Sequence, residues 1–211
     1  MLTSQVNPIL RPKPKAKTAK ASATLIKRNL RFERRHKREE QLDATRLRRA
    51  LEHIDRLPQP GWAMHCVFPG NFNGWDFIPA VLRLIQPATL RHLAITTLSF
   101  NKRNSSQLLE LIDSGAVARA DLVASIFFEQ AEGNVEMCAH LASELRRRGS
   151  RFATCRNHTK VICAETTDHR HYVIESSCNL RSCGNLEQLT IFHDAGLLEF
   201  HAAWIGGLLD S

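Results

Sequence analysis

The stretch NHTKVICAETTDHRHYVIESSCNLRSCGNLEQ, residues 157–188, contains two short apolar runs with polar residues at their ends. The first run predicts a strand over 158–165, and the second predicts a strand over 171–177. Alternation along the first strand places His158 and Lys160 on one face. A buried strand needs neither group, whereas a site that holds a phosphate needs groups of this kind. The stretch therefore predicts two neighbouring strands that carry an anion site.

Further polar residues lie at the ends of these strands. Glu165 closes the first strand, Ser177 and Asn179 close the second, and Glu187 precedes the next apolar run. Because the ends of neighbouring strands come together in α/β sites, we expect these side chains to gather around His158. Each residue also has a simpler interpretation. Serine and asparagine favour turns, and Glu187 would then pair with a surface arginine.

Outward from this stretch, strand and helix patterns alternate from residue 61 onward. The remaining strands are predicted at 64–68, 93–100, 121–128, 151–155 and 188–194, and the helices at 75–85, 105–115, 134–149 and 195–209. Strands separated by helices indicate an α/β fold with a mixed, largely parallel sheet flanked by helices. The short turns between the last three strands predict an antiparallel part.

The N-terminal part differs in composition from the rest. Residues 1–60 hold 16 Lys and Arg against 6 Asp and Glu, a net charge of +10 in a chain of net +8. We predict a disordered basic tail over 1–24, a basic helical arm over 25–60 and a domain over 61–211. An apolar stripe on the arm that includes Leu47 and Ile54 must bury against the domain or against a second copy of the chain.

Basic residues on the arm are candidates for contact with a polyanion, because lysine and arginine near phosphates release condensed counterions. The alternative is a solvated, solubilising face. The candidates for a nucleic-acid grip are Arg34, Arg35, Lys37, Arg38, Arg46 and Arg49.

The six cysteines and the hydropathy bound the class of protein. No run of about 18 apolar residues occurs, so no membrane span is expected, and without a secretory signal we expect a cytoplasmic protein of bacterial or phage origin. The cysteines are expected to be thiols. A zinc site from Cys178 and Cys183 with His169 or His171 is the alternative, although no tight Cys-x2-Cys pair supports it.

The spacing His158-x-Lys160-x4-Glu165, followed by Ser177-x-Asn179 and Glu187, resembles the phospholipase D superfamily. That family's signature is His-x-Lys-x4-Asp, then Gly-Ser-x-Asn and a later acidic residue, and the resemblance covers about residues 60–208. Two positions depart from it. Glu165 stands where the family has Asp, with Asp168 as an alternative acid, and Ser176 stands where the family has Gly.

The resemblance implies a metal-independent phosphodiesterase, a hydrolase without a cofactor. One His158 would attack phosphorus and form a phosphohistidine, and a second would protonate the leaving group. Lys160, Ser177 and Asn179 would bind the phosphate, while Glu165 and Glu187 would orient the imidazoles. Since the motif occurs once, the resemblance implies a homodimer with a shared site.

The basic arm favours a nuclease acting on DNA or RNA, because a lipid-cleaving member would more often carry an interfacial element, and none is found. Two alternatives stay open. One is a catalytically drifted module that binds nucleic acid, and the other is a phospholipase.

Overall fold

The computed structural model describes residues 37–69 and 72–210. The strands are β1 (Ala63–Phe68), β2 (Phe72–Asn73), β3 (Leu90–Thr97), β4 (Ala120–Ser125), β5 (Arg151–Cys155), β6 (Val161–Thr166), β7 (His171–Ser176), β8 (Ser182–Cys183) and β9 (Glu187–His193). The helices are α2 (Lys37–His53), α3 (Phe77–Leu84), α4 (Lys102–Asp113), α5 (Ile126–Glu129), α6 (Val135–Arg147) and α7 (Ala195–Leu209), with a 3-10 turn η1 (Gly74–Asp76).

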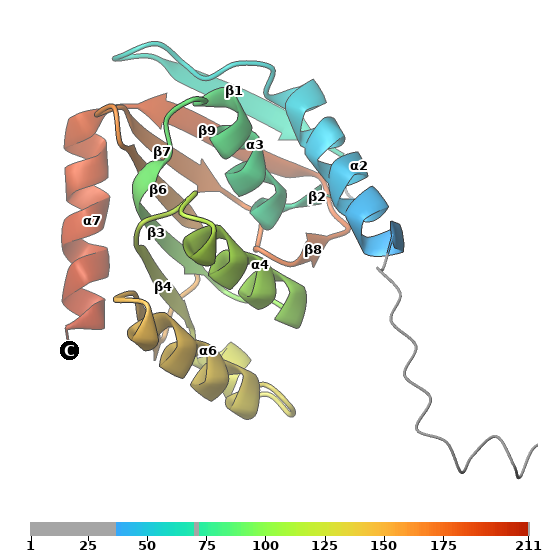
Figure 1. The fold of residues 1–211 in the computed structure, drawn as a ribbon, viewed down its shortest axis with the longest axis vertical. Coiled ribbons are helices and arrows are strands. Elements are labelled where there is room, and N and C mark those ends of the chain that lie inside the picture. The colour runs from blue at the N-terminus through green and yellow to red at the C-terminus, as the bar shows by residue number, and fades with distance from the viewer. Residues whose placement is uncertain (1–36, 70–71, 211) are drawn as a thin grey trace, which may run out of the picture. The chain divides into compact units, whose positions relative to one another are not determined.

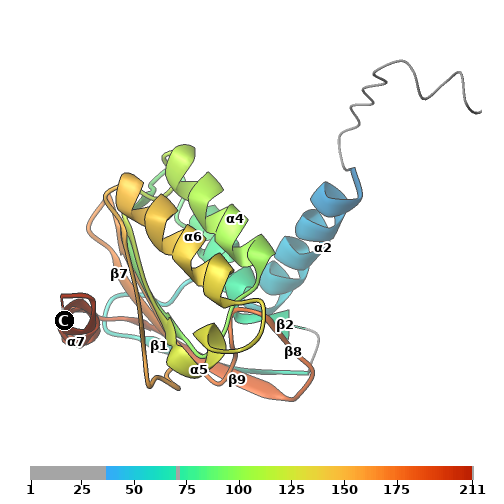
Figure 2. The ribbon, with the colours of Figure 1, turned by 90° about the horizontal axis from the view of Figure 1, so that it is seen from below.

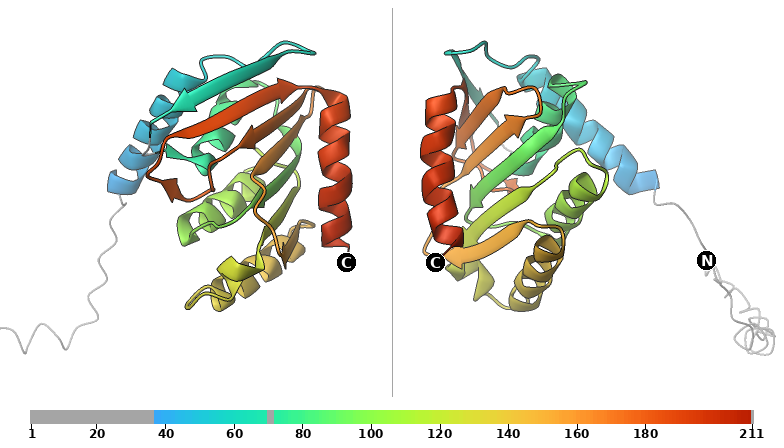
Figure 3. Two further views of the ribbon diagram at one scale, coloured as in Figure 1. Left: turned by 180° about the vertical axis from the view of Figure 1, so that it is seen from behind. Right: turned by 60° about the vertical axis from the view of Figure 1, so that its left-hand side comes forward.

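Seven strands form one sheet in the order β1-β9-β7-β6-β3-β4-β5 (Figures 1 and 3). The prediction of a mixed α/β sheet with flanking helices is confirmed. The prediction that the sheet is largely parallel was wrong. Only β3–β4 and β4–β5 are parallel, whereas the other four pairings are antiparallel. Strand β6 inserts beside β3 in the opposite direction, and short connections then force β7 and β9 to alternate.

Helices cover both faces of the sheet. Figure 2 shows α7 on one side and α4 with α6 on the other. Side chains of β6 alternate between the two faces of the sheet. Ile162 and Ala164 pack in the larger core, whereas Val161 and Cys163 pack in the core beneath α7. The two-face pattern predicted for this strand therefore holds from Val161 onward.

Helix α2 is part of the domain. Ala50 and Ile54 are fully buried, and Leu47 and Leu51 pack against the same core. Of the two partners left open for this stripe, the domain is the one it contacts. The compact unit that contains the sheet begins at Arg38 and so includes nearly all of α2. The predicted helix over 25–36 and the tail over 1–24 lie outside the described residues.

Two predicted strands have different limits because side chains cap the neighbouring helices. Ser125 ends β4 and accepts a hydrogen bond from Phe127 N at 3.3 Å, which starts α5 where a longer strand was predicted. Asn101 accepts a hydrogen bond from Asn104 N at 2.9 Å and so starts α4. The strand predicted over 93–100 runs from Leu90 to Thr97.

A buried carboxylate joins the starts of three strands. Asp121 on β4 is 1% exposed, and its oxygens lie 3.0 Å from His92 Nε2, 3.0 Å from Arg119 Nη2 and 2.7 Å from Arg151 Nη2. Burial alone would raise the pKa of Asp121, but the hydrogen bonds from His92 and Arg151 outweigh it and hold the pKa well below its usual value. Arg151 also pairs with Asp210 at the end of α7.

Replacing Asp121 with asparagine is expected to lower the free energy of unfolding by about 3 kcal/mol at neutral pH, because the partly exposed Arg119 and Arg151 lose the buried carboxylate that they pair with. A depressed pKa stabilises the fold above the ordinary aspartate pKa of about 3.9, and this contribution is lost as pH falls below that value. Urea denaturation should therefore show a variant deficit that shrinks in acid. The surface change Asp113→Asn, which removes an exposed carboxylate paired with Arg148, should cost clearly less than Asp121→Asn. Equal costs for the two variants would contradict this account.

Candidate active site

Several strands end or begin at the same end of the sheet, the end at which β3 and β7 finish and β6 and β9 start. The antiparallel register pairs Thr96 of β3 with Val161 of β6, and Val161 with Glu175 of β7. Ser176 of β7 pairs with Leu189 of β9. We call this edge, which runs from the end of β3 past the start of β6 and the end of β7 to the start of β9, the site edge. It brings together the ends of the two strands in the 157–188 stretch.

His158 and Lys160 lie at this edge, in an extended segment that leads into β6. The strand itself begins at Val161 rather than at residue 158. Lys160 Nζ lies 3.0 Å from His158 Nδ1 and donates a hydrogen bond to the His158 carbonyl oxygen at 2.7 Å. His158 is exposed and Lys160 is half-buried. The structure thus places an imidazole and an ammonium group side by side at the surface.

A buried asparagine holds this segment in place. Asn157 donates from Nδ2 to the Thr97 carbonyl oxygen at 3.2 Å, and its Oδ1 accepts from Thr159 N at 2.8 Å. Thr159 Oγ1 also lies 2.8 Å from Thr96 Oγ1. These contacts fix the backbone on both sides of His158. Sequence reasoning missed them, although an asparagine side chain commonly accepts a hydrogen bond from the backbone N–H two residues further on.

Ser177 and Glu187 form a pair across β7 and β9. Ser177 Oγ donates a short hydrogen bond to Glu187 Oε2 and accepts one from Gln188 N at 3.0 Å. Glu187 is 8% exposed. The carboxylate is therefore held by a serine inside the sheet edge, rather than by a surface arginine.

Asn179 lies where the chain crosses the start of β6. Ser176 N donates to the Lys160 carbonyl oxygen at 3.0 Å, and Leu180 N donates to Thr97 Oγ1 at 3.2 Å. The segment between them therefore runs from β7 to β3 past Lys160. Asn179 Oδ1 is buried without a hydrogen-bond partner in the described part of the chain.

Gly74 allows this crossing. Its N–H donates to the Asn179 carbonyl oxygen at 2.8 Å, and a Cβ added at Gly74 would lie 2.8 Å from the same oxygen. A side chain at position 74 would push the Asn179 segment away, so the glycine positions a candidate site residue.

Glu165 lies at the other end of β6. It is bonded to Arg91 and lies 3.8 Å from His171 Nε2. Seven residues of extended chain separate it from His158 by about 20 Å, so the prediction that Glu165 orients this imidazole is wrong. The alternative acid, Asp168, pairs with Arg170 on the turn beyond β6 and is equally remote.

Other predicted roles are also changed by the structure. His169 and His171 lie at the edge opposite Cys178, so the alternative zinc set is not brought together. Among the described residues, no three His, Cys, Asp or Glu side chains are grouped to hold a metal ion. Trp75, in the turn after β2, is 3% exposed and belongs to the core.

The basic arm is described only in part. Arg34 and Arg35 and the side chains of Lys37 and Arg38 lie outside the described residues. Arg49 is exposed as predicted, whereas Arg46 is half-buried and lines a cavity with Asp76. No helix within 37–69 and 72–210 is long and apolar enough to cross a membrane.

Comparison with known proteins identifies the fold. No family model matches the sequence, and no curated protein matches it. Among solved structures, Nuc from Salmonella typhimurium, a phospholipase D family member, aligns with a TM-score of 0.50 and 17% identity over 71% of this chain and 95% of that one. The fold is phospholipase D-like.

Two larger proteins match this phospholipase D-like fold over part of their length. Polyphosphate kinase from Porphyromonas gingivalis has a TM-score of 0.49 and 15% identity, over 74% of this chain and 26% of that one. Phosphatidylserine synthase from Haemophilus influenzae has a TM-score of 0.45 and 14% identity, over 78% of this chain and 41% of that one. The chain thus spans nearly all of Nuc but less than half of these two proteins.

Proposed function

We propose that this chain is a phosphodiesterase that cleaves nucleic acid through a phosphohistidine formed on His158, in a site shared by two copies of the chain. The observation that carries the proposal is the contact between His158 and Lys160 at the site edge. The phospholipase D-like fold supports it, as do the Ser177–Glu187 pair and Asn179 on the neighbouring strands.

The chemistry follows from these groups. An imidazole nitrogen attacks phosphorus and displaces an alkoxide, which divides one difficult displacement into two easier steps. The Lys160 ammonium and the Asn179 amide stabilise the charge that develops on the non-bridging oxygens, and Ser177 becomes a further donor once its hydroxyl turns away from Glu187. Lysine and histidine then supply the positive charge at the reacting phosphate.

The reacting state requires His158 to turn. In the structure, Nδ1 of His158 faces Lys160 Nζ rather than a carboxylate. Glu187 instead accepts its hydrogen bond from Ser177. A neutral imidazole has one donor nitrogen and one acceptor nitrogen, so the attacking nitrogen must face phosphorus while the other donates to an acceptor. His158 is exposed and has room to rotate, and Glu187 is the candidate carboxylate at this edge.

A second copy would supply the second imidazole. One His158 serves as nucleophile, and the other protonates the leaving alkoxide and then activates water. Exposed apolar side chains near the site edge suit such a partner: Val67 is 66% exposed, Phe127 63% and Leu186 72%. Leu186 precedes Glu187, Val67 pairs with Gln188, and Phe127 follows β4. A two-fold contact through this rim would place both histidines together.

Nucleic acid is the proposed substrate because the positive charge is concentrated in residues 1–60, where exposed Arg48 and Arg49 extend the basic region onto α2. The second candidate is a module that binds nucleic acid without cleaving it. One observation favours that candidate: Glu187 accepts its hydrogen bond from Ser177 rather than from His158, so this carboxylate does not orient the imidazole. Turnover decides between them.

A mixing experiment tests the shared site. Equal amounts of wild type and His158→Ala are unfolded together and refolded, and cleavage is measured per total chain. Random pairing leaves about a quarter of the wild-type rate if each site needs two histidines, and about half if each chain acts alone. Mixing wild type with His140→Ala, an exposed histidine on α6, should keep the full rate. A result near one half would contradict the shared site but not the phosphodiesterase.

A further inference from the structure

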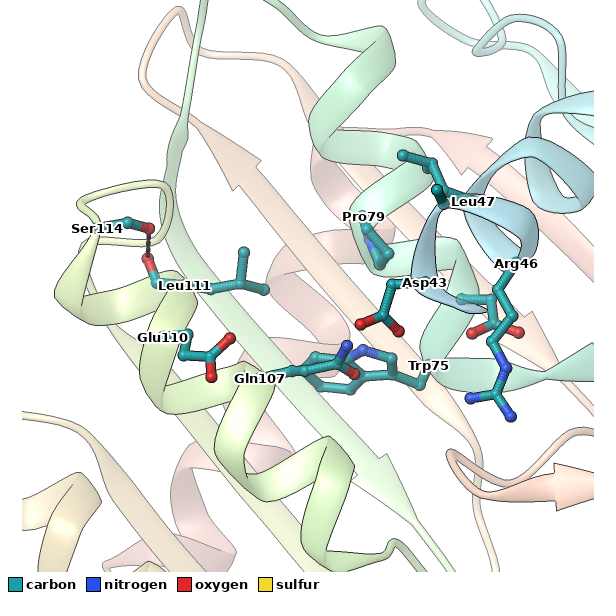
Figure 4. A pocket seen from close by; sticks show the side chains of 11 residues that line it. Asp43, Arg46, Leu47, Trp75, Pro79, Gln107, Glu110, Leu111 and Ser114 are labelled. Atoms are coloured by element: carbon teal, nitrogen blue, oxygen red, sulfur yellow. Dashed lines mark hydrogen bonds between the residues drawn. The ribbon is translucent and has the colours of Figure 1, made fainter. Parts of the chain in front are cut away.

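A cavity of about 440 Å³ lies between α2, the η1 turn and α4 (Figure 4). Its walls include Asp43 and Arg46 from α2, Trp75 and Asp76 from η1, and Gln107 and Glu110 from α4. None of its lining residues belongs to the cluster around His158. Its volume is within the usual range for small-molecule sites, about 300 to 1,000 Å³.

The cavity combines an aromatic wall with carboxylates. Figure 4 shows the carboxylates of Asp43 and Glu110, from two different helices, turned toward the space beside the Trp75 ring. Three carboxylates, Asp43, Asp76 and Glu110, face two guanidinium groups, Arg46 in the cavity wall and Arg103 paired with Asp43, in a chain whose overall net charge is +8. The cavity wall therefore carries a net negative charge, although the chain as a whole is positively charged.

Two of the three carboxylates are poorly compensated. Asp76 is 5% exposed, and in the described structure its hydrogen bonding is a single 3.3 Å contact from Asn73 N to Oδ2. Glu110 makes no ion pair within the described residues, whereas Asp43 pairs with Arg103. A buried carboxylate with one long hydrogen bond and no ion pair is costly, so the Asp76 side chain is a candidate to receive a positively charged ligand.

We infer that this cavity binds an organic cation, an alkylammonium or alkylguanidinium group, whose charge lies between Asp76 and Glu110 and whose apolar body lies against the wall formed by Leu47, Pro79 and the accessible edge of Trp75. The same chemistry is presented by a free diamine and by a lysine or arginine side chain of a peptide. The inference does not depend on the phosphodiesterase activity.

Calorimetric titration of the full chain with 1,4-diaminobutane, agmatine and a blocked lysine tripeptide tests the site. Binding of either small amine, but not of 1-butanol, is expected, and Asp76→Asn and Glu110→Gln should each weaken it at least about tenfold. Glu136→Gln, an exposed acid on α6, is the matched control and should leave the affinity unchanged. Tighter binding of the tripeptide than of the diamine would identify a peptide side chain as the ligand, and the reverse a free amine.

Proton release gives a second readout. Burial raises the pKa of Asp76 to about 6, against the opposing charges of Arg46 and Arg103 and with the help of Asp43. A bound cation lowers this pKa, so binding near pH 6 should release a proton, and the release should vanish in Asp76→Asn. Titration in two buffers of different ionisation enthalpy measures it.

The exposed Glu110 keeps the inference testable if Asp76→Asn fails to fold. Absence of binding by all three cations at roughly 10 mM would overturn the inference. So would an affinity that Glu110→Gln and a folded Asp76→Asn both leave unchanged. Neither result bears on cleavage at His158.

Discussion

Replacing His158 with alanine is expected to reduce phosphodiester cleavage by at least about 10³-fold, because the substitution removes the nucleophile and the general acid together. In a shared site both copies lose the imidazole. Lys160 would remain as a cation next to an empty position, and its ammonium group would not replace the nucleophile. The measurement is cleavage of single-stranded DNA, plasmid DNA and RNA by wild type and variant in parallel.

Excess EDTA belongs in every reaction. Since Lys160 and His158 provide the positive charge and the proton transfers, wild-type cleavage is expected to persist in the chelator. His140→Ala, which removes an exposed histidine on α6, should retain the wild-type rate and controls for general effects of losing a histidine. Equal cleavage by wild type and His158→Ala would place the activity elsewhere. No cleavage by either protein, on any of the three substrates, would leave the binding module.

The strand pair around the candidate site was predictable, because the alternation of Val161, Ile162, Cys163 and Ala164 directly encodes two buried faces. The order of strands was not. Local pattern fixes where a strand lies in the sequence but not which strand becomes its neighbour, so the insertion of β6 beside β3 reversed the expected balance of parallel and antiparallel pairs.

The site was predictable only in part, for a related reason. Residues at the ends of adjacent strands, such as Lys160 and Ser177, gather because register brings the ends together. Glu165 matched a sequence spacing, yet an extended strand carries it to the far edge, where Arg91 binds it. Two residues that match a motif but lie several positions apart in one extended strand are therefore held apart, not brought together.

The buried carboxylates had no sequence signal. Asp121 is paired with His92, Arg119 and Arg151, which come from three different segments, and only tertiary structure brings them together. The cavity beside Asp76 likewise depends on α2 packing against the domain, which the sequence left open as one of two choices.

Replacing Lys160 with methionine is expected to lower kcat by about 10² to 10³-fold, the usual loss when one preorganised charge-stabilising donor is removed from a reacting oxyanion. Methionine keeps much of the length and apolar body of the stem, so the substitution chiefly removes the charge. A two-fold site would lose both ammonium groups. The effect should be larger on kcat than on KM, because the charge on the non-bridging oxygens is stabilised most in the transition state.

Lys102→Met, an exposed lysine at the start of α4, is the matched control and should change kcat by less than about threefold. Lys160→Arg restores the charge but spreads it over a planar group, so a partial recovery is expected. Thermal unfolding of all three variants checks the fold, since Lys160 also donates to the His158 carbonyl oxygen. If Lys160→Met weakens binding of DNA while wild type shows no turnover, the ammonium group holds phosphate in a module that does not cleave it. If kcat falls with the fold intact, Lys160 and His158 act on the same phosphate.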